Sequence, residues 1–332
     1  MKATRLVLLL AACLLVLSGC SKFDDLRTGE PPGFAKVKVQ SHGLDQERFA
    51  TIPGIGLKVH YRIIGKGPVN MVFIPGWTNP LTVYSKQFDY FRNKARCIYI
   101  DLPGHGLSDA PEGVEYTQEL MADAIYAVLK KEGVQKFIGV GFSWGHQPLT
   151  QLEIKHPGMI TKLILLDIGI THWGTPYPNM NEATRNYLNE VYLNMGDDDK
   201  VAALGGLIPL ATAPADLIEW GKYFLDYPNW LMANLYYHLL EESVCQPYAW
   251  DIPIMVVYRR IGTAIEYRTN LFFPGCEIHI LDVPAPSQHV IQWAYHETLN
   301  PMMLEFIKSS YPGKVPFPYL SANTSENQHL YP

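Results

Sequence analysis

A serine flanked by glycines is the residue of this chain best placed to act as a nucleophile. An apolar run at 137–140 leads into Gly-Phe-Ser-Trp-Gly at 141–145, and the segment from there to Lys155 is compatible with a helix. Gly-x-Ser-x-Gly between a strand and a helix forms a tight turn that holds the serine hydroxyl above the strand ends. Both flanking positions are glycine because side chains there would collide with neighbouring backbone. The pattern predicts that Ser143 is a nucleophile.

His289 is the histidine predicted to serve as the base. A serine hydroxyl is a poor nucleophile until a base takes its proton during the attack. Of the eleven histidines, only His289 lies in a loop after a late predicted strand, at 278–281, and directly before a predicted helix, at 291–307. A surface or core histidine without a catalytic role is the alternative interpretation.

Continuous apolar runs alternate with helix-compatible segments along most of the chain. The runs lie at 69–74, 97–100, 137–140, 162–166, 254–257 and 278–281, and the helical segments lie at 84–93, 117–132, up to 155, and at 291–307. Apolar strands that alternate with helices are typical of a parallel sheet covered by helices on both faces. A hairpin of strands at 48–51 and 57–64, joined by a Pro/Gly turn, precedes them.

The segment between Thr171 and Asp251 shows no strand signal and is rich in aromatic residues. Helices are predicted at 181–194, 198–204 and 215–242, and together they resemble a helical cap over the strand ends. We therefore divide the chain into a core at 47–172 and 251–312, a helical cap at 173–250, a tether at 20–46 and a flexible tail at 313–332.

The N-terminus has the pattern of a targeting signal. Lys2 and Arg5 precede an apolar run at 6–17, which is too short to span a bilayer as a stable helix. Leu-Ser-Gly-Cys at 17–20 resembles the lipobox of bacterial lipoprotein signal peptides. That resemblance implies removal of residues 1–19, lipid on Cys20, and an extracytoplasmic, membrane-anchored protein on the periplasmic side or at an outer membrane. An ordinary secretory cleavage site is the alternative.

Composition argues against several other classes of function. Apolar residues make up 48% of the chain, the net charge is −5, and no basic cluster is present, so nucleic-acid binding is not expected. Outside the signal peptide and Cys20, the cysteines are Cys97, Cys245 and Cys276, without metal-like spacing. We expect no metal and no organic cofactor, a buried Cys97, and at most one disulfide, between Cys245 and Cys276.

Two further segments carry a family resemblance. Phe-Ile-Pro-Gly-Trp at 73–77 follows the first central strand, and Asp-Leu-Pro-Gly-His-Gly-Leu-Ser at 101–108 follows the second. Together with Ser143 and His289, they resemble the α/β-hydrolase superfamily from about 48 to 307. The resemblance implies that backbone N–H groups of Trp77 and Trp144 form the oxyanion hole. It also places His105 in a structural turn without a catalytic role.

The acid is predicted by comparison with that family. Most members carry an aspartate in the loop after the strand that corresponds to 254–257, but the loop at 258–264 contains no carboxylate. Some members take the acid from the end of the preceding strand, where this chain has Asp167. Asp167 is therefore the predicted acid, which would hold His289 in the correct tautomer. The alternatives are that Asp167 only caps its loop, leaving an unassisted Ser–His pair, or that Glu266 is the acid.

The identity of the nucleophile restricts the chemistry. Dehalogenases and epoxide hydrolases of this fold attack with aspartate, a route that is closed to Ser143. We expect hydrolysis of a small or medium apolar carboxylic ester through an acyl-enzyme. The alternatives within the fold are a lactonase, a carbon–carbon bond hydrolase or an aminopeptidase, although Glu241 and Glu242 are too little evidence to assign the amine-binding role of an aminopeptidase. An inactive binding protein that has kept the fold is the alternative from another class.

Overall fold

The computed structural model describes residues 45–168, 171–172, 175–176, 181–240, 251–259, 269, 273, 275–281, 283 and 288–309. The predicted signal peptide with Cys20, the tether up to residue 44, and the tail lie outside the described residues. So do Glu241, Glu242, Cys245 and Glu266.

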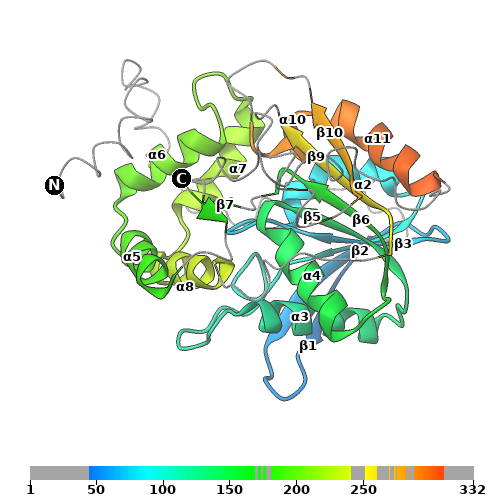
Figure 1. Ribbon diagram of the computed structural model, residues 1–332, viewed down its shortest axis with the longest axis horizontal. Coiled ribbons are helices and arrows are strands. Elements are labelled where there is room, and N and C mark those ends of the chain that lie inside the picture. Colours follow the sequence, from blue (N-terminus) through cyan, green and yellow to red (C-terminus); the bar gives the residue numbers. More distant parts are fainter. Residues whose placement is uncertain are drawn as a thin grey trace, which may run out of the picture.

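One eight-stranded sheet organises the core, with the strand order β1-β2-β4-β3-β5-β6-β9-β10 (Figure 1). The strands are β1 (Asp45–Thr51), β2 (Lys58–Ile64), β3 (Asn70–Ile74), β4 (Arg96–Ile100), β5 (Phe137–Phe142), β6 (Ile160–Leu166), β9 (Ile254–Arg259) and β10 (Glu277–Leu281). β2 pairs antiparallel with β1 and β4, and the other neighbouring strands pair in parallel. The mostly parallel sheet and the N-terminal hairpin are confirmed.

Helices cover both faces of this sheet. α3 (Gln118–Lys131) packs with α4 (His146–Lys155), whereas α2 (Ser85–Phe91) packs with α10 (Ile291–Ala294) and α11 (His296–Lys308). In Figure 1 the two groups lie on opposite sides of the sheet. The central strands are covered on both faces, and every residue of β5 is buried. Continuous apolar runs, rather than alternating ones, follow from this double coverage.

Four helices form a group beside the sheet, on the left of Figure 1. They are α5 (Glu182–Leu193), α6 (Asp197–Leu207), α7 (Ala215–Leu225) and α8 (Asn229–Leu239). α5 packs against α8 and α6 packs against α7. We call these four helices the cap. Of the described helices, none is long and apolar enough to cross a membrane.

Three predicted elements differ from the structure. The helix expected at 215–242 is divided into α7 and α8, because Pro228 lacks an N–H and cannot continue the helix that precedes it. The helix expected at 291–307 is divided at Tyr295, whose hydroxyl accepts the backbone N–H of Gln288 at 3.2 Å. The helix expected at 84–93 is a 3₁₀ turn, η4 (Leu81–Tyr84), followed by α2.

A short antiparallel pair also lies where no strand was expected. β7 (Thr171–His172) pairs with β8 (Thr175–Pro176), just after the core strand β6. Two residues are too few to show the alternation of apolar and polar residues by which a strand is recognised in a sequence.

Candidate active site

The turn after β5 places Ser143 as its sequence pattern predicts. Ser143 has a φ of 50°, in the left-handed region, and its side chain is only half-buried. A Cβ at Gly145 would lie 2.4 Å from the carbonyl oxygen of Ile74, and one at Gly141 would lie 2.9 Å from that of Gly145. Real Cβ atoms do not approach backbone so closely. Gly145 is therefore required to bring the turn against the end of β3, and Gly141 is required where the end of β5 lies against the start of α4.

The imidazole of His289 lies between Ser143 and Asp167. Its Nε2 is 3.0 Å from Ser143 Oγ. Its Nδ1 is hydrogen-bonded to Asp167 Oδ2. A carboxylate can only accept, so Nδ1 carries the hydrogen, and in the neutral ring Nε2 is left to accept the hydroxyl proton of the serine. The structure thus brings together the three side chains that the sequence analysis selected for nucleophile, base and acid.

Asp167 is buried at the end of β6, with 3% of its surface exposed and a φ of 45°. Its Oδ1 accepts the backbone N–H of Arg259 at 3.1 Å, and Arg259 Nε lies 3.1 Å from Oδ2. A buried carboxylate needs such donors, because its charge has lost the water that would otherwise solvate it. Asp167 therefore holds the end of β9 and contacts His289 as well, so the capping contact and the histidine contact coexist.

The loop after β3 passes directly beside the nucleophile. A Cβ at Gly76 would lie 3.1 Å from Ser143 Cβ, so the backbone that leads into Trp77 lies beside the serine. Within the described residues, no acceptor is hydrogen-bonded to the backbone N–H of Trp77. Trp144 follows Ser143 in the turn η5 (Ser143–Gly145), and 2% of its surface is exposed.

The cap encloses this loop with aromatic rings. The indole of Trp77 makes edge-to-face contacts with Tyr192, Phe224 and Tyr236, with ring centroids 5.0, 5.9 and 5.0 Å apart. The cap also reaches the base, since the backbone N–H of His289 donates to the carbonyl oxygen of Leu207 at 2.9 Å. Cap residues therefore contact both sides of the candidate site.

Two residues near the site, Arg259 and His146, were missed from the sequence. Arg259, which contacts Asp167, had a possible signal in its position at the end of the strand next to β6. His146 had none that distinguishes it from other buried histidines, whereas His105 was expected in a structural turn without a catalytic role. His146 Nδ1 donates to the backbone oxygen of Ser143 at 2.7 Å, and burial lowers the pKa of its imidazole to about 4.

Other potential reactive groups lie apart from Ser143. Burial raises the pKa of the Cys97 thiol to about 12, as expected for a core cysteine, and Cys97 and Cys276 are both free thiols. No group of three potential metal ligands occurs in the part of the chain that the structure describes.

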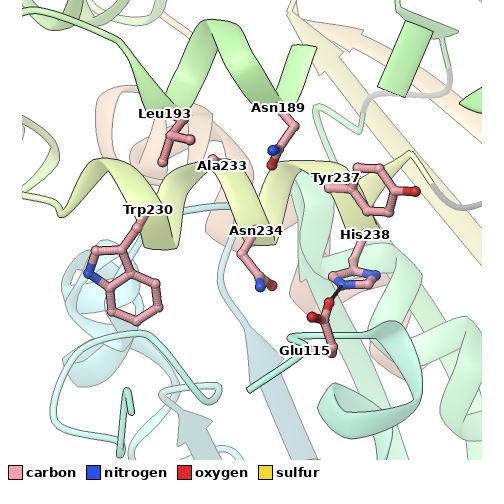
Figure 2. Close-up of a pocket in the computed structure, with 8 residues that line it drawn as sticks. All are labelled: Glu115, Asn189, Leu193, Trp230, Ala233, Asn234, Tyr237 and His238. Carbon is pink, nitrogen blue, oxygen red and sulfur yellow. Dashed lines mark hydrogen bonds and ion pairs between the residues drawn. The ribbon is translucent and has the colours of Figure 1, made fainter. Parts of the chain in front are cut away.

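A hollow of about 370 Å³ opens between α5, α8 and the loop before α3 (Figure 2). In it, His238 Nε2 lies 2.8 Å from Glu115 Oε2, and Asn189, Leu193, Trp230, Ala233, Asn234 and Tyr237 complete the lining. None of the three side chains of the candidate site lines this hollow.

Residues 69–238 match the model of the alpha/beta hydrolase fold family. The chain belongs to this family. It is 25% identical over 285 residues to epoxide hydrolase 3 of Mus musculus, covering 76% of this chain and 74% of that protein. A match to epoxide hydrolase 3 of Xenopus tropicalis, 28% identical, spans 35% of that protein. A 2-hydroxy-6-oxononadienedioate/2-hydroxy-6-oxononatrienedioate hydrolase of Paraburkholderia phymatum is 29% identical over 280 residues, covering 76% of this chain and 92% of the relative.

Solved structures show the same fold. An esterase from Exiguobacterium antarcticum superposes with a TM-score of 0.67 at 17% identity, covering 80% of this chain and all of the esterase. The enol-lactonase from Burkholderia xenovorans gives a TM-score of 0.66 at 16% identity, covering 79% of this chain and all of that protein. The family and the names of its relatives support hydrolase activity for this chain.

Proposed function

We propose that this protein is a serine hydrolase that acts on a small or medium apolar carboxylic ester through an acyl-enzyme. The observation that carries the proposal is the continuous contact from Ser143 Oγ to His289 Nε2 at 3.0 Å and from His289 Nδ1 to Asp167. Ser143 is the nucleophile, His289 is the general base and then the general acid, and Asp167 holds the imidazole in its tautomer.

Each step moves one proton through His289. Ser143 Oγ attacks the ester carbonyl carbon as its proton passes to His289 Nε2, and the charge that develops on the carbonyl oxygen is stabilised by the N–H groups of Trp77 and Trp144. The imidazolium then protonates the departing alcohol as the C–O bond breaks. Water attacks the acyl-enzyme with His289 as base, and the proton returns to Ser143 Oγ when the carboxylic acid leaves.

The choice of an ester follows from the nucleophile and the surroundings of the site. Several relatives are named epoxide hydrolases, but the expected route for such enzymes begins with an aspartate, and this chain has Ser143 in that turn. A serine attacks an acyl carbon readily once a base is in contact with it. Apolar substituents are supported by the aromatic rings of the cap that pack around Trp77.

Carbon–carbon bond hydrolysis is the second candidate. It is supported by the Paraburkholderia phymatum relative, of which this chain covers 92%. A panel of p-nitrophenyl esters, lactones and 2-hydroxy-6-oxo dienoates separates the two proposals. We expect the highest kcat/KM on the esters, and a preference for the dienoates by tenfold or more would favour the second candidate.

Covalent labelling tests the nucleophile directly. The folded domain should react with a fluorophosphonate, and intact-mass spectrometry should show one adduct per chain that peptide mapping locates at Ser143. Ser143→Ala should abolish both the adduct and ester hydrolysis. Absence of labelling in the wild-type protein, or equal labelling of Ser143→Ala, would favour an inactive binding protein that has kept the fold.

We further propose that Cys20 carries a lipid anchor that holds the enzyme on the extracytoplasmic side of a bacterial membrane. The support is the lipobox-like stretch at 17–20 after a short apolar run. Cys20→Ser should move the full-length protein from the membrane fraction to the soluble fraction. The matched variant Cys13→Ser, in the apolar run, should leave it in the membrane fraction. Equal fractionation of the two variants would contradict the anchor.

A further inference from the structure

His105 contacts both segments that we assign to the oxyanion hole, one through the backbone of Thr78 and the other through the side chain of Trp144. His105 lies in the turn after β4, and 1% of its surface is exposed. Its Nε2 accepts the backbone N–H of Thr78 at 3.2 Å. Its ring stacks on the indole of Trp144, with centroids 5.4 Å apart and planes inclined by 19°. One side chain therefore connects the loop after β3 with the turn that contains Ser143.

The hydrogen bonds of His105 define its protonation state. Nδ1 lies 3.0 Å from the carbonyl oxygen of Pro103 and must donate to it, whereas Nε2 faces an N–H and must accept. Only the neutral imidazole with its hydrogen on Nδ1 satisfies both contacts. Burial favours the same form, because it lowers the pKa of the ring to about 4. At neutral pH, His105 thus presents a lone pair to Thr78.

The backbone that this lone pair holds is in an uncommon conformation. Thr78 has a φ of 60°, and a β-branched residue rarely occupies the left-handed region unless the surrounding structure keeps it there. The N–H that His105 accepts belongs to the peptide between Trp77 and Thr78, next to the peptide that carries the Trp77 N–H. Rotation of the first peptide would turn the second away from Ser143.

We propose that His105 is a positioning residue that holds the two N–H donors of the oxyanion hole in register with Ser143. The hydrogen bond to Thr78 orients the Trp77 N–H, and the stacked ring holds Trp144. His105 touches no reacting atom, so its effect is on the transition state, where the oxyanion forms, and substrate binding is spared. This inference rests on the proposed serine hydrolase activity.

Two substitutions of His105 separate its hydrogen bond from its volume. His105→Phe keeps an aromatic ring next to Trp144 but has no acceptor for the Thr78 N–H. His105→Gln can present its Oε1 to that N–H. On a p-nitrophenyl ester, we expect kcat of His105→Phe to fall by about 10²-fold with KM changed less than about 3-fold, the loss typical of a misplaced catalytic group. We expect kcat of His105→Gln to be at least tenfold higher than that of His105→Phe.

A transition-state analogue provides a readout that a merely structural role would not move. An alkyl boronic acid becomes tetrahedral on Ser143 and places an oxygen in the oxyanion hole. The affinity for the boronic acid should fall in His105→Phe in parallel with kcat. The affinity for an ether analogue of the ester, which has no carbonyl oxygen, should be unchanged. If His105→Phe does not fold, His105→Met replaces it in these measurements, because methionine also lacks a strong acceptor and has a flexible side chain.

His238→Gln is the matched control. His238 is also a buried histidine with a polar partner, Glu115, but it lies in the hollow of Figure 2 and not at the Ser143 turn. Its kcat and boronate affinity should equal those of the wild-type protein. Histidine ¹⁵N NMR spectra of the wild-type protein at pH 7 should also show a neutral, Nδ1-protonated ring that is lost in His105→Phe.

The outcomes distinguish this inference from the proposed function. If the wild-type protein neither labels nor hydrolyses esters, the serine hydrolase proposal fails. If it does both, but His105→Phe and His105→Met keep wild-type kcat, only the positioning role is overturned. A rise in KM with unchanged kcat, or a charged or Nε2-protonated His105 at pH 7, would overturn it as well.

Discussion

Among the described residues, two buried Asp–His pairs are alike in most respects. Asp167 follows β6 and contacts Nδ1 of His289, and Asp101 follows β4 and lies 2.7 Å from Nδ1 of His60. Both carboxylates are nearly fully buried, with 3% and 2% exposed. Each also accepts backbone N–H groups. Asp167 accepts that of Arg259, and Asp101 accepts those of Leu81 and Leu107 at 2.6 and 3.0 Å.

The two pairs differ in what the second ring nitrogen faces. Nε2 of His289 faces Ser143 Oγ, and the ring is partly open, with 17% of the side chain exposed. Nε2 of His60 is buried and has no hydrogen-bond partner among the described residues. The Asp101–His60 pair joins β2 to the turn after β4, and its second ring nitrogen contacts no hydroxyl among the described residues. A base for catalysis also requires a nucleophile at the other nitrogen and access for substrate.

Removal of the carboxylate behind His289 is expected to have the largest effect on rate. Asp167→Asn should lower kcat by about 10⁴-fold, because the amide no longer selects the tautomer in which Nε2 is the base. Steady-state kinetics on the best ester of the panel measures this. Near-normal turnover would show that another carboxylate supports His289, and Glu266→Gln would then be the variant to examine.

Two buried histidines outside the Asp–His pairs extend the comparison to the pH dependence of stability. His105 and His146 are hydrogen-bonded to backbone, and burial lowers the pKa of each to about 4. In the unfolded chain a histidine has a pKa near 6.5, so between about pH 6.5 and 4 the unfolded state binds protons that the folded state does not. The free energy of unfolding should therefore fall as the pH is lowered from about 6.5 to 4, by about 1.4 kcal/mol per pH unit for each of the two residues.

Denaturant titrations from pH 7 to 4 measure that slope. His105→Gln removes one of the two groups and should reduce the slope by about 1.4 kcal/mol per pH unit. An unchanged slope in this variant would mean that His105 is protonated in the folded protein, which would contradict its contact with the Thr78 N–H.

The second Asp–His pair should affect stability far more than rate. Asp101→Asn replaces a buried carboxylate, which binds His60 and two backbone N–H groups, with a neutral amide. We therefore expect the free energy of unfolding to fall by about 2–3 kcal/mol. Its effect on kcat should be at least 100-fold smaller than that of Asp167→Asn. Equal losses of kcat in the two variants would break the distinction between the pairs.

The smallest effect is expected where a carboxylate is exposed. Asp216 in α7 lies 3.0 Å from Lys86 Nζ in α2 and joins the cap to the core, with 51% of its side chain exposed. Asp216→Asn should lower the free energy of unfolding by less than about 1 kcal/mol, because water and salt screen the pair. Asp123→Asn is the matched control, since Asp123 pairs with Lys155 within the core at 2.6 Å. Raising the salt concentration should reduce the difference between each variant and the wild-type protein.

Patterns in neighbouring residues predicted most of the sheet and of the site. The strands and Ser143 follow from apolar runs and glycines a few residues apart, which report burial and turn geometry locally. Pro228 is a local signal for the break between α7 and α8. The helical periodicity on both sides of it nevertheless led to the prediction of one continuous helix. The contact between His289 and Asp167 was an expectation drawn from a family resemblance, because local patterns carry no information about which carboxylate reaches a distant ring.

The sequence by itself determined the fold class and the turn that contains Ser143, the proposed nucleophile, since both depend on spacings within one element or one turn. Only the tertiary structure decided how the remaining groups meet. Ser143 and His289 are separated by 146 positions, and Asp167 and His289 by 122. The register of parallel strands brings them to one edge of the sheet. The same folding brings His105 against both Thr78 and Trp144, a set of contacts that depends on three loops packing together.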